Sequence, residues 1–433
     1  MERYRRCPRP AARSVAMLSL FAAGTARANP PIPLLPEGPA PATGQPEVQV
    51  HGYLQTDGIA WAQNSEDQLT PSTSEPLNQE RLLIRRARLE ADVRRGRLLG
   101  MVEIDANTVR GPTTGLASAE FSYLAIRSQP ELPDLFMASL GLLRIPFGAE
   151  VQERDRDRLF LERSNVGRAL FPGAFDLAAR LQARWRSLVL QLAATNGDPA
   201  GSGKYALQNT NAAKDLAGRL AANIVGSGRL RVEGGVSFLQ GKGFHPGTPA
   251  TKEVLVWRDQ NEDGIVQTSE IQIIPGTPAT PSRNFQRFAV GCDLRLVGDL
   301  PRLGQVTAFG EVVWASNLDR ALLPADPVGS GRDLRELGIV AGITQELGGH
   351  LVLGARYDWY NADLDAAKAL PVRIVPSSAV FSTTAFVVAW RFSSLDRIAV
   401  EFDLNRNPLG RGSAGLPANL PSDTLTVRAQ LAY

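Results

Sequence analysis

From Val48 onward, apolar residues alternate with polar or small residues in runs of roughly ten to fourteen positions, and Gly, Pro, Asn or Asp ends each run. In residues 86–93, every second position is Ala, Leu or Val, and the positions between them are Arg, Glu or Asp. Residues 102–107 repeat this pattern after the short turn at 94–97. A period of two, with charges on one face and aliphatic side chains on the other, predicts a β-strand between lipid and an aqueous lumen.

The same pattern recurs along the body of the chain and predicts an all-β fold, a transmembrane antiparallel up-and-down β-barrel of about sixteen strands. Short connections follow the even-numbered strands, and long connections follow the odd-numbered ones. Because such barrels have short periplasmic turns and long outer loops, this parity predicts that both termini lie in the periplasm. The expected strand cores are 48–62, 81–94, 97–107, 118–128, 134–145, 176–184, 187–196, 213–224, 229–241, 283–297, 303–316, 332–346, 349–360, 378–391, 394–405 and 422–433.

The first 28 residues have the features of a secretory signal peptide. Five arginines precede an apolar run at 15–24, and Ala26-Arg27-Ala28 then supplies the small-x-small cleavage pattern. This segment carries six Arg and one Glu, so cleavage takes the net charge from +3 to about −2. The basic character therefore belongs mainly to the signal, and it gives no support to a nucleic-acid partner.

Residues 29–47 are rich in Pro and predict an extended periplasmic spacer before the barrel at 48–433. After the signal, no uninterrupted apolar run has the length of a membrane-spanning helix, so a membrane protein here must be made of strands. Cys7 leaves with the signal, and we interpret the remaining Cys292 as a small apolar residue.

The chain ends in an alternating run that closes on Tyr433. This run resembles the C-terminal signature by which the barrel-assembly machinery recognises outer-membrane proteins. A soluble, secreted all-β protein is the alternative, because its strands would also alternate. Such a protein gains nothing from the regular succession of long and short loops, so we favour a barrel in the bacterial outer membrane, in contact with its lipid.

Several segments resemble the phosphate- and polyphosphate-selective outer-membrane porins of the O and P type. The similarity is strongest in residues 84–89 (Ile-Arg-Arg-Ala-Arg-Leu) and 141–148 (Gly-Leu-Leu-Arg-Ile-Pro-Phe-Gly), and it continues through 161–164 and the pair Asn196-Gly197. The Pro-Phe-Gly segment before a long charged loop is the most distinctive element. The resemblance implies a sixteen-stranded barrel, often a homotrimer, whose third outer loop folds into the lumen and narrows it.

That loop would extend over residues 146–175. Arginines at a constriction select anions by replacing part of the anion's hydration with charge-assisted hydrogen bonds. We therefore expect an outer-membrane porin that allows passive diffusion of small hydrophilic solutes, including anions such as phosphate. The expected pore and constriction residues are Arg86, Arg88, Arg144, Arg154, Arg156, Arg158, Arg163 and Arg168.

An equally weighted alternative is that the loop arginines pair with Asp155, Asp157 and Glu162 and only hold the loop in place. Carboxylates on the neighbouring strands also offset Arg86 and Arg88. In the resembled family a lysine cluster attracts phosphate, whereas the lysines left after the signal lie away from the expected constriction. They are Lys204, Lys214, Lys242, Lys252 and Lys368. Anion selectivity is therefore a hypothesis, and phosphate preference is the part that the residues support least.

Residues 259–270 fit the calcium-loop pattern D-x-[DN]-x-[DN]-G-x5-E at every fixed position. Gly264 permits the sharp turn, and hard oxygen ligands at this spacing suit Ca²⁺. The flanking segments 253–257 and 271–274 have the pattern of strands, unlike the helices of an EF-hand, and an acidic surface turn is the alternative. The expected role of the ion is to stiffen a long outer loop. The expected ligands are Asp259, Asn261, Asp263, Ile265 (through its carbonyl), Gln267 and Glu270.

No linear motif indicates an enzyme. The three histidines, His51, His245 and His350, are far apart in the chain and form no zinc or nucleophile pattern. We therefore expect no enzymatic activity. A structural or adhesin-like barrel without pore activity, and a barrel hydrolase with catalytic residues at its rim, remain the alternatives.

Overall fold

The computed structural model describes residues 45–67, 69, 80–126, 136–203, 205–225, 230–301, 303–369, 374–376 and 379–433. In these residues, sixteen antiparallel strands form one closed barrel, and the last strand pairs with the first. The barrel strands are β1 (Glu47–Gln63), β2 (Arg81–Arg95), β3 (Leu98–Asn107), β4 (Thr113–Ile126), β5 (Phe136–Arg144), β6 (Phe175–Trp185), β7 (Leu188–Thr195), β8 (Asp215–Val225), β9 (Leu230–His245), β12 (Arg283–Leu300), β13 (Gly304–Ser316), β14 (Arg335–Leu347), β15 (Leu351–Asn361), β18 (Val380–Arg391), β19 (Arg397–Arg411) and β20 (Pro417–Ala432).

Each expected strand core overlaps one of these strands, so the predicted fold class and strand number are confirmed. The largest differences lie at the outer ends of three strands: β4 already begins at Thr113, and β19 and β20 extend their ladder to Arg411 and Pro417. The ladder of β19 and β20 continues because a register shift between Asn407 and Gly410 accommodates residues whose sequence breaks the alternation. The predicted signal peptide (1–28) and nearly all of the predicted spacer (29–47) lie outside the described residues.

The barrel wall has an apolar outside and a polar inside. In β12, Val290, Cys292 and Leu294 point outward and are exposed, whereas Arg287 and Asp293 point inward. The same alternation leaves large aliphatic and aromatic side chains exposed on the outer face of most strands. A closed barrel leaves no unpaired strand edge, and a polypeptide can cross the hydrocarbon core in this form. The chain is therefore a transmembrane β-barrel of the bacterial outer membrane.

The remaining elements are short. They are the helices α1 (Ala149–Gln152), α2 (Asn165–Leu170) and α3 (Pro327–Ser330), the 3-10 turn η1 (Thr268–Glu270), and the two-stranded pairs β10 (Val254–Trp257) with β11 (Ile271–Ile274) and β16 (Ala367–Ala369) with β17 (Ile374–Pro376). Among the described residues, no helix is long and apolar enough to cross a membrane.

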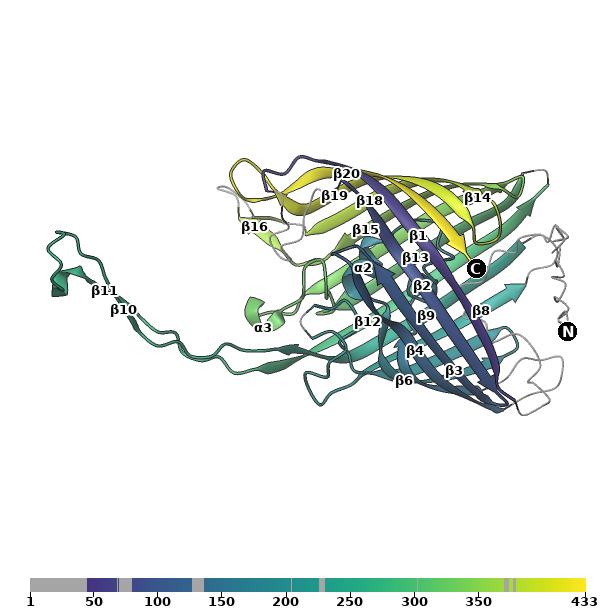
Figure 1. Cartoon of the computed structure of the whole chain (residues 1–433), viewed down its shortest axis with the longest axis horizontal. Coiled ribbons are helices and arrows are strands. Elements are labelled where there is room, and N and C mark those ends of the chain that lie inside the picture. The colour runs from purple at the N-terminus through teal and green to yellow at the C-terminus, as the bar shows by residue number, and fades with distance from the viewer. Residues whose placement is uncertain are drawn as a thin grey trace, which may run out of the picture.

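Residues 246–282 between β9 and β12, here called the outer hairpin, extend far from the barrel at the end opposite the C-terminus (Figure 1). β10 and β11 form its distal part, and the calcium-type loop lies at its tip. The flanks of that loop are strands, as the sequence pattern predicts.

The apolar core lies inside the barrel. Residues 145–174 between β5 and β6, here called the inner loop, contribute Phe147, Val166 and Phe171 to a buried cluster with inward side chains such as Val313 and Tyr360. A second cluster joins Phe160 and Leu161 of the inner loop to β15, β18 and β19. The lumen is thus partly filled by a packed segment of the chain.

Candidate functional site

The inner loop starts with a sharp turn at the Pro-Phe-Gly segment. Gly148 has a φ of 56°, and a Cβ there would lie 2.1 Å from a carboxylate oxygen of Glu311, so glycine is required. The amide of Gly148 donates to the Ser237 hydroxyl at 3.0 Å, and those of Ala149 and Glu150 donate to Glu311 at 3.0 and 3.1 Å. The loop therefore turns into the lumen and is held against β9 and β13.

Two inward glycines on the wall make room for the inner loop. Gly291 on β12 faces Phe147, because a Cβ at Gly291 would lie 3.1 Å from that ring. Gly338 on β14 faces Val166, and a Cβ there would lie 2.5 Å from a methyl carbon of Val166. Phe147 in turn packs on Phe171, with 4.7 Å between ring centroids. The wall and the loop are complementary in shape on this side.

Polar contacts hold the middle of the inner loop on β15, which is next to β14, and on β19 farther round the wall. The amide of Leu161 donates to Glu401 on β19 at 2.8 Å. Asn165 donates to Asp358 on β15 from its backbone at 3.0 Å and from its side chain at 2.6 Å. The Ser164 hydroxyl accepts from Gly167 at 3.1 Å and caps α2. The loop therefore crosses the lumen and contacts strands on several sides of it.

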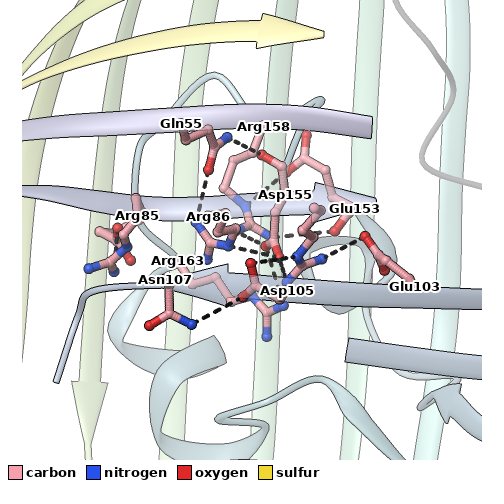
Figure 2. A network of polar contacts seen from close by, with 12 residues as sticks. Gln55, Arg85, Arg86, Glu103, Asp105, Asn107, Glu153, Asp155, Arg158 and Arg163 are labelled. Atoms are coloured by element: carbon pink, nitrogen blue, oxygen red, sulfur yellow. Dashed lines mark hydrogen bonds and ion pairs between the residues drawn. The ribbon is translucent and has the colours of Figure 1, made fainter. Parts of the chain in front are cut away.

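A cluster of four arginines surrounds Asp155 of the inner loop (Figure 2). Burial would raise the pKa of Asp155, but the positive charges of Arg86, Arg158 and Arg88 outweigh it and hold the pKa well below its usual value. Asp155 is 5 % exposed, and this surplus of opposite charge keeps it ionised. The distances from its carboxylate oxygens are 3.3 Å to Arg86 Nε, 3.0 Å to Arg88 Nη2, 2.9 Å to Arg158 Nη1 and 3.7 Å to Arg163 Nη2.

Four of the eight predicted pore residues thus meet at one carboxylate, and the other four lie apart from it. Arg144 donates to the carbonyls of Val151 and Glu153 at 2.9 Å each. Arg156 lies 3.8 Å from Asp157, and Arg168 is exposed at the end of α2.

Arg154 is exposed, with 46 % of its side chain accessible, and its nearest carboxylate is Glu90 at 3.9 Å. It therefore faces the water-accessible part of the lumen next to β2.

Several residues in the cluster could not be recognised from the inner-loop sequence. Arg85 lies 2.6 Å from Glu162, because a bulge between β1 and β2 turns it toward the lumen beside Arg86. Arg428 of the last strand bonds Asp57 of the first strand at 2.7 Å, and it also reaches Glu162 at 3.1 Å. Barrel closure places β20 beside β1, so the alternation of the last strand was the one available signal for Arg428.

The predicted calcium ligands lie together at the tip of the outer hairpin. Asp259 accepts from the amides of Asp263 and Gly264 at 3.2 and 2.8 Å, and Asn261 accepts from Asp263 at 3.2 Å. Ile265 and Gln267 both donate to Asp263. Glu270 is 6 % exposed and accepts from Trp257 at 3.0 Å and from the Gln260 amide at 3.1 Å. Asp259, Asn261 and Asp263 thus form a turn of oxygen donors of the kind that Ca²⁺ prefers.

No family model matches the chain, and no curated protein sequence is significantly similar to it. Solved structures are similar in fold. The anion-selective porin from Comamonas acidovorans superposes with a TM-score of 0.53 at 8 % identity, over 90 % of this chain and 100 % of that one. The outer membrane channel DcaP of Acinetobacter baumannii gives 0.50 at 10 % identity, over 91 % and 99 %. The trimer form of OmpT, an outer membrane protein of Vibrio cholerae, gives 0.50 at 11 % identity, over 90 % and 99 %.

These superpositions establish the fold, that of the outer-membrane β-barrels. At such low sequence identities, the activity has to be argued from the residues of this chain.

Proposed function

We propose that the protein is a porin through which small hydrophilic solutes diffuse passively, with a preference for anions. The observation that carries this proposal is the inner loop, which crosses the lumen and brings Arg158 and Arg163 against Arg86 and Arg88 of β2 around one carboxylate. A segment packed inside a barrel narrows the aqueous path, and the residues at the narrowing determine what passes.

The inner loop itself has five arginines and five carboxylates, so the proposed preference for anions depends on further arginines of the barrel wall beside it. Arg144 bonds backbone carbonyls and lies over the ring of Phe175, with 4.6 Å to the ring centroid. Arg397 bonds the carbonyls of Arg156 and Arg158 and the side chain of Gln430. Neither guanidinium forms an ion pair with a carboxylate among the described residues. Their charge is not cancelled by a direct ion pair, so it adds to the positive field of the lumen; Arg397 is 4 % exposed and would act through this field, not by contact with the solute.

Phosphate is the narrower form of this proposal, suggested by the resemblance to the phosphate- and polyphosphate-selective porins. A guanidinium can bind two phosphate oxygens at once, so the arginines could replace the lysines that the described lumen lacks near the inner loop. Measuring chloride conductance in the presence of increasing phosphate would distinguish a general preference for anions from a preference for phosphate.

We also propose a homotrimer, because one structurally similar outer-membrane barrel is known in a trimer form. At the outer hairpin, Ca²⁺ bound by Asp259, Asn261, Asp263 and Glu270 would stiffen the tip. The carbonyl of Ile265 and the side chain of Gln267 would complete the ligand set.

Planar-bilayer recording of the purified, refolded protein tests the pore. We expect stepwise conductance and a reversal potential in a KCl gradient that indicates anion preference. Absence of steps would favour a structural or adhesin-like barrel, and cation preference would refute the role of the arginines. A barrel hydrolase would depend on a pair such as His245 and Asp326, which lie 3.1 Å apart at the outer end. Hydrolysis of peptide or ester substrates that His245→Gln abolishes would replace the pore proposal.

A further inference from the structure

Three metal-ligating side chains meet inside the barrel, outside the arginine cluster. His51 on β1 is paired in register with Glu90 on β2, and Asp92 follows two positions later on the same face. His51 Nε2 lies 3.2 Å from Glu90 Oε2 and 3.7 Å from Asp92 Oδ2. One ligand atom from each residue lies within 4.8 Å of the other two.

This donor set suits a borderline transition-metal ion such as Zn²⁺. Imidazole nitrogen and carboxylate oxygen bind zinc at about 2.0–2.2 Å, so neighbouring ligands of a tetrahedral site lie about 3.3 Å apart. The two separations from His51 bracket this value, and all three ligand atoms lie within 4.8 Å of one another, so rotation of the carboxylate side chains would bring them to bonding distance. Both strands are held by the barrel ladder, so the three side chains are already positioned before an ion arrives.

Water and ions can reach the three residues from the lumen. The side chains of His51, Glu90 and Asp92 are 28 %, 12 % and 39 % exposed. Two arginines of the inner loop act on these carboxylates: Arg154, at 3.9 Å from Glu90, and Arg156, whose charge reaches Asp92 and whose nearest carboxylate is Asp157 at 3.8 Å. The long separation between Arg154 and Glu90 and the exposure of Arg154 make this a weak ion pair that a divalent cation can replace. A water molecule would complete the coordination, because three protein ligands leave one position open.

We propose that His51, Glu90 and Asp92 bind one divalent transition-metal ion, with Zn²⁺ as the test ion. Metal binding replaces the ion pair between Glu90 and Arg154, and it places the two positive charges of the ion beside the water-accessible lumen. The histidine is essential to the selection of the ion, since its nitrogen favours Zn²⁺ over Ca²⁺ and Mg²⁺, which prefer all-oxygen sites. This site is therefore chemically distinct from the loop at the tip of the outer hairpin.

The test is a zinc titration of the full-length protein, folded in detergent and freed of metal with a chelator, against a chromophoric competitor. Millimolar Ca²⁺ is present throughout to occupy the outer hairpin. We expect one Zn²⁺ per chain, with affinity reduced at least tenfold in His51→Gln and in Glu90→Gln. His350→Gln is the matched control, because His350 lies in an exposed turn where it contacts the Arg391 carbonyl at 3.0 Å and stacks on Trp390.

Equal zinc affinity in His51→Gln and the unmodified protein would overturn the proposal. Absence of stoichiometric binding would also overturn it, and His51, Glu90 and Asp92 would then be no more than an ion-paired cluster. Circular dichroism and heat-dependent gel mobility establish that each variant is folded. Any change of conductance on zinc binding would depend on the proposed pore function, whereas the binding titration does not depend on it. Zinc binding without conductance steps would therefore retain the metal site and reject the pore.

Discussion

Asp155 is the residue at which the architecture of the inner loop can be tested most directly. Its carboxylate is buried under four guanidiniums at 2.9 to 3.7 Å. Asp155→Asn keeps the size of the side chain and removes its charge. The variant leaves Arg86, Arg88, Arg158 and Arg163 without their shared counterion, so we expect the inner loop to separate more often from the wall of β1 and β2.

The size of the effect follows from burial. Removing one partner of a buried ion pair costs about 3–5 kcal/mol, because the remaining charges stay desolvated without compensation. At about 1.4 kcal/mol for each factor of ten, the open state of the loop becomes roughly 10² to 4 × 10³ times more populated. Arg88 and Arg158 keep contacts with Glu103 and Glu153, which places the expected value toward the lower end.

Limited trypsin digestion with mass spectrometry measures this opening at Arg158, whose side chain is 4 % exposed in the closed loop. Asp157→Asn is the matched control, since Asp157 is two residues away and its nearest cationic partner is Arg156 at 3.8 Å, a partly exposed pair of little energetic weight. We expect cleavage after Arg158 to accelerate strongly in Asp155→Asn and to change less than threefold in Asp157→Asn. Cleavage at Arg258 in the outer hairpin should be unchanged in both.

Bilayer recording gives a second readout of the same variant. The loss of one negative charge should shift the reversal potential further toward anion preference, and loop opening should add current noise. If Arg158 remains as protected in Asp155→Asn as in Asp157→Asn, the apolar contacts alone hold the loop, and the reasoning from the charge cluster is wrong.

Three further outcomes are expected. Gly338→Leu should displace Val166 and destabilise the inner loop by about 1–3 kcal/mol, measured by the same trypsin assay with Gly298→Leu, where nothing lies near a Cβ, as the control. Arg86→Gln combined with Arg88→Gln should reduce anion preference in reversal-potential measurements, whereas an unchanged potential would assign these residues to loop anchoring alone. Asp259→Ala combined with Glu270→Ala should abolish calcium affinity in calorimetry and remove the protection of the outer hairpin by calcium against trypsin; unchanged affinity would remove the metal claim.

The barrel could be predicted from sequence because each strand carries its own signal. Alternation in a stretch such as 86–93 records which side of the wall each residue faces, and turn residues mark the strand ends. This local information is repeated in every strand. The ends of β19 and β20 were predicted too short, because Asn407, Pro408 and the glycines beyond them resemble a loop although the ladder continues across a register shift.

The candidate site was only partly predictable, because its members are far apart in the chain. The inward position of Arg86 and Arg88 was predicted from the alternation, and the inward folding of the loop was predicted from the family resemblance. The contact of Glu401 with the Leu161 amide joins residues 240 positions apart, and no periodicity indicates it. The same limit explains His51, Glu90 and Asp92, whose proximity depends on the register of two strands and leaves no linear motif.

The structure also bears on why the inner loop carries so many charges. Phe147, Val166 and Phe171 already seat the loop in apolar contacts on β12 to β15, and buried ion clusters are an ineffective way to add stability compared with apolar packing of the same volume. If the loop only had to be held in place, more apolar residues would stabilise it better than charged ones. The arginines are concentrated instead at 154–163, where Arg154 is open to water. The loop is thus divided into an apolar part that anchors it and a charged part of which Arg154 is open to the lumen, and this is the arrangement that the proposed constriction needs.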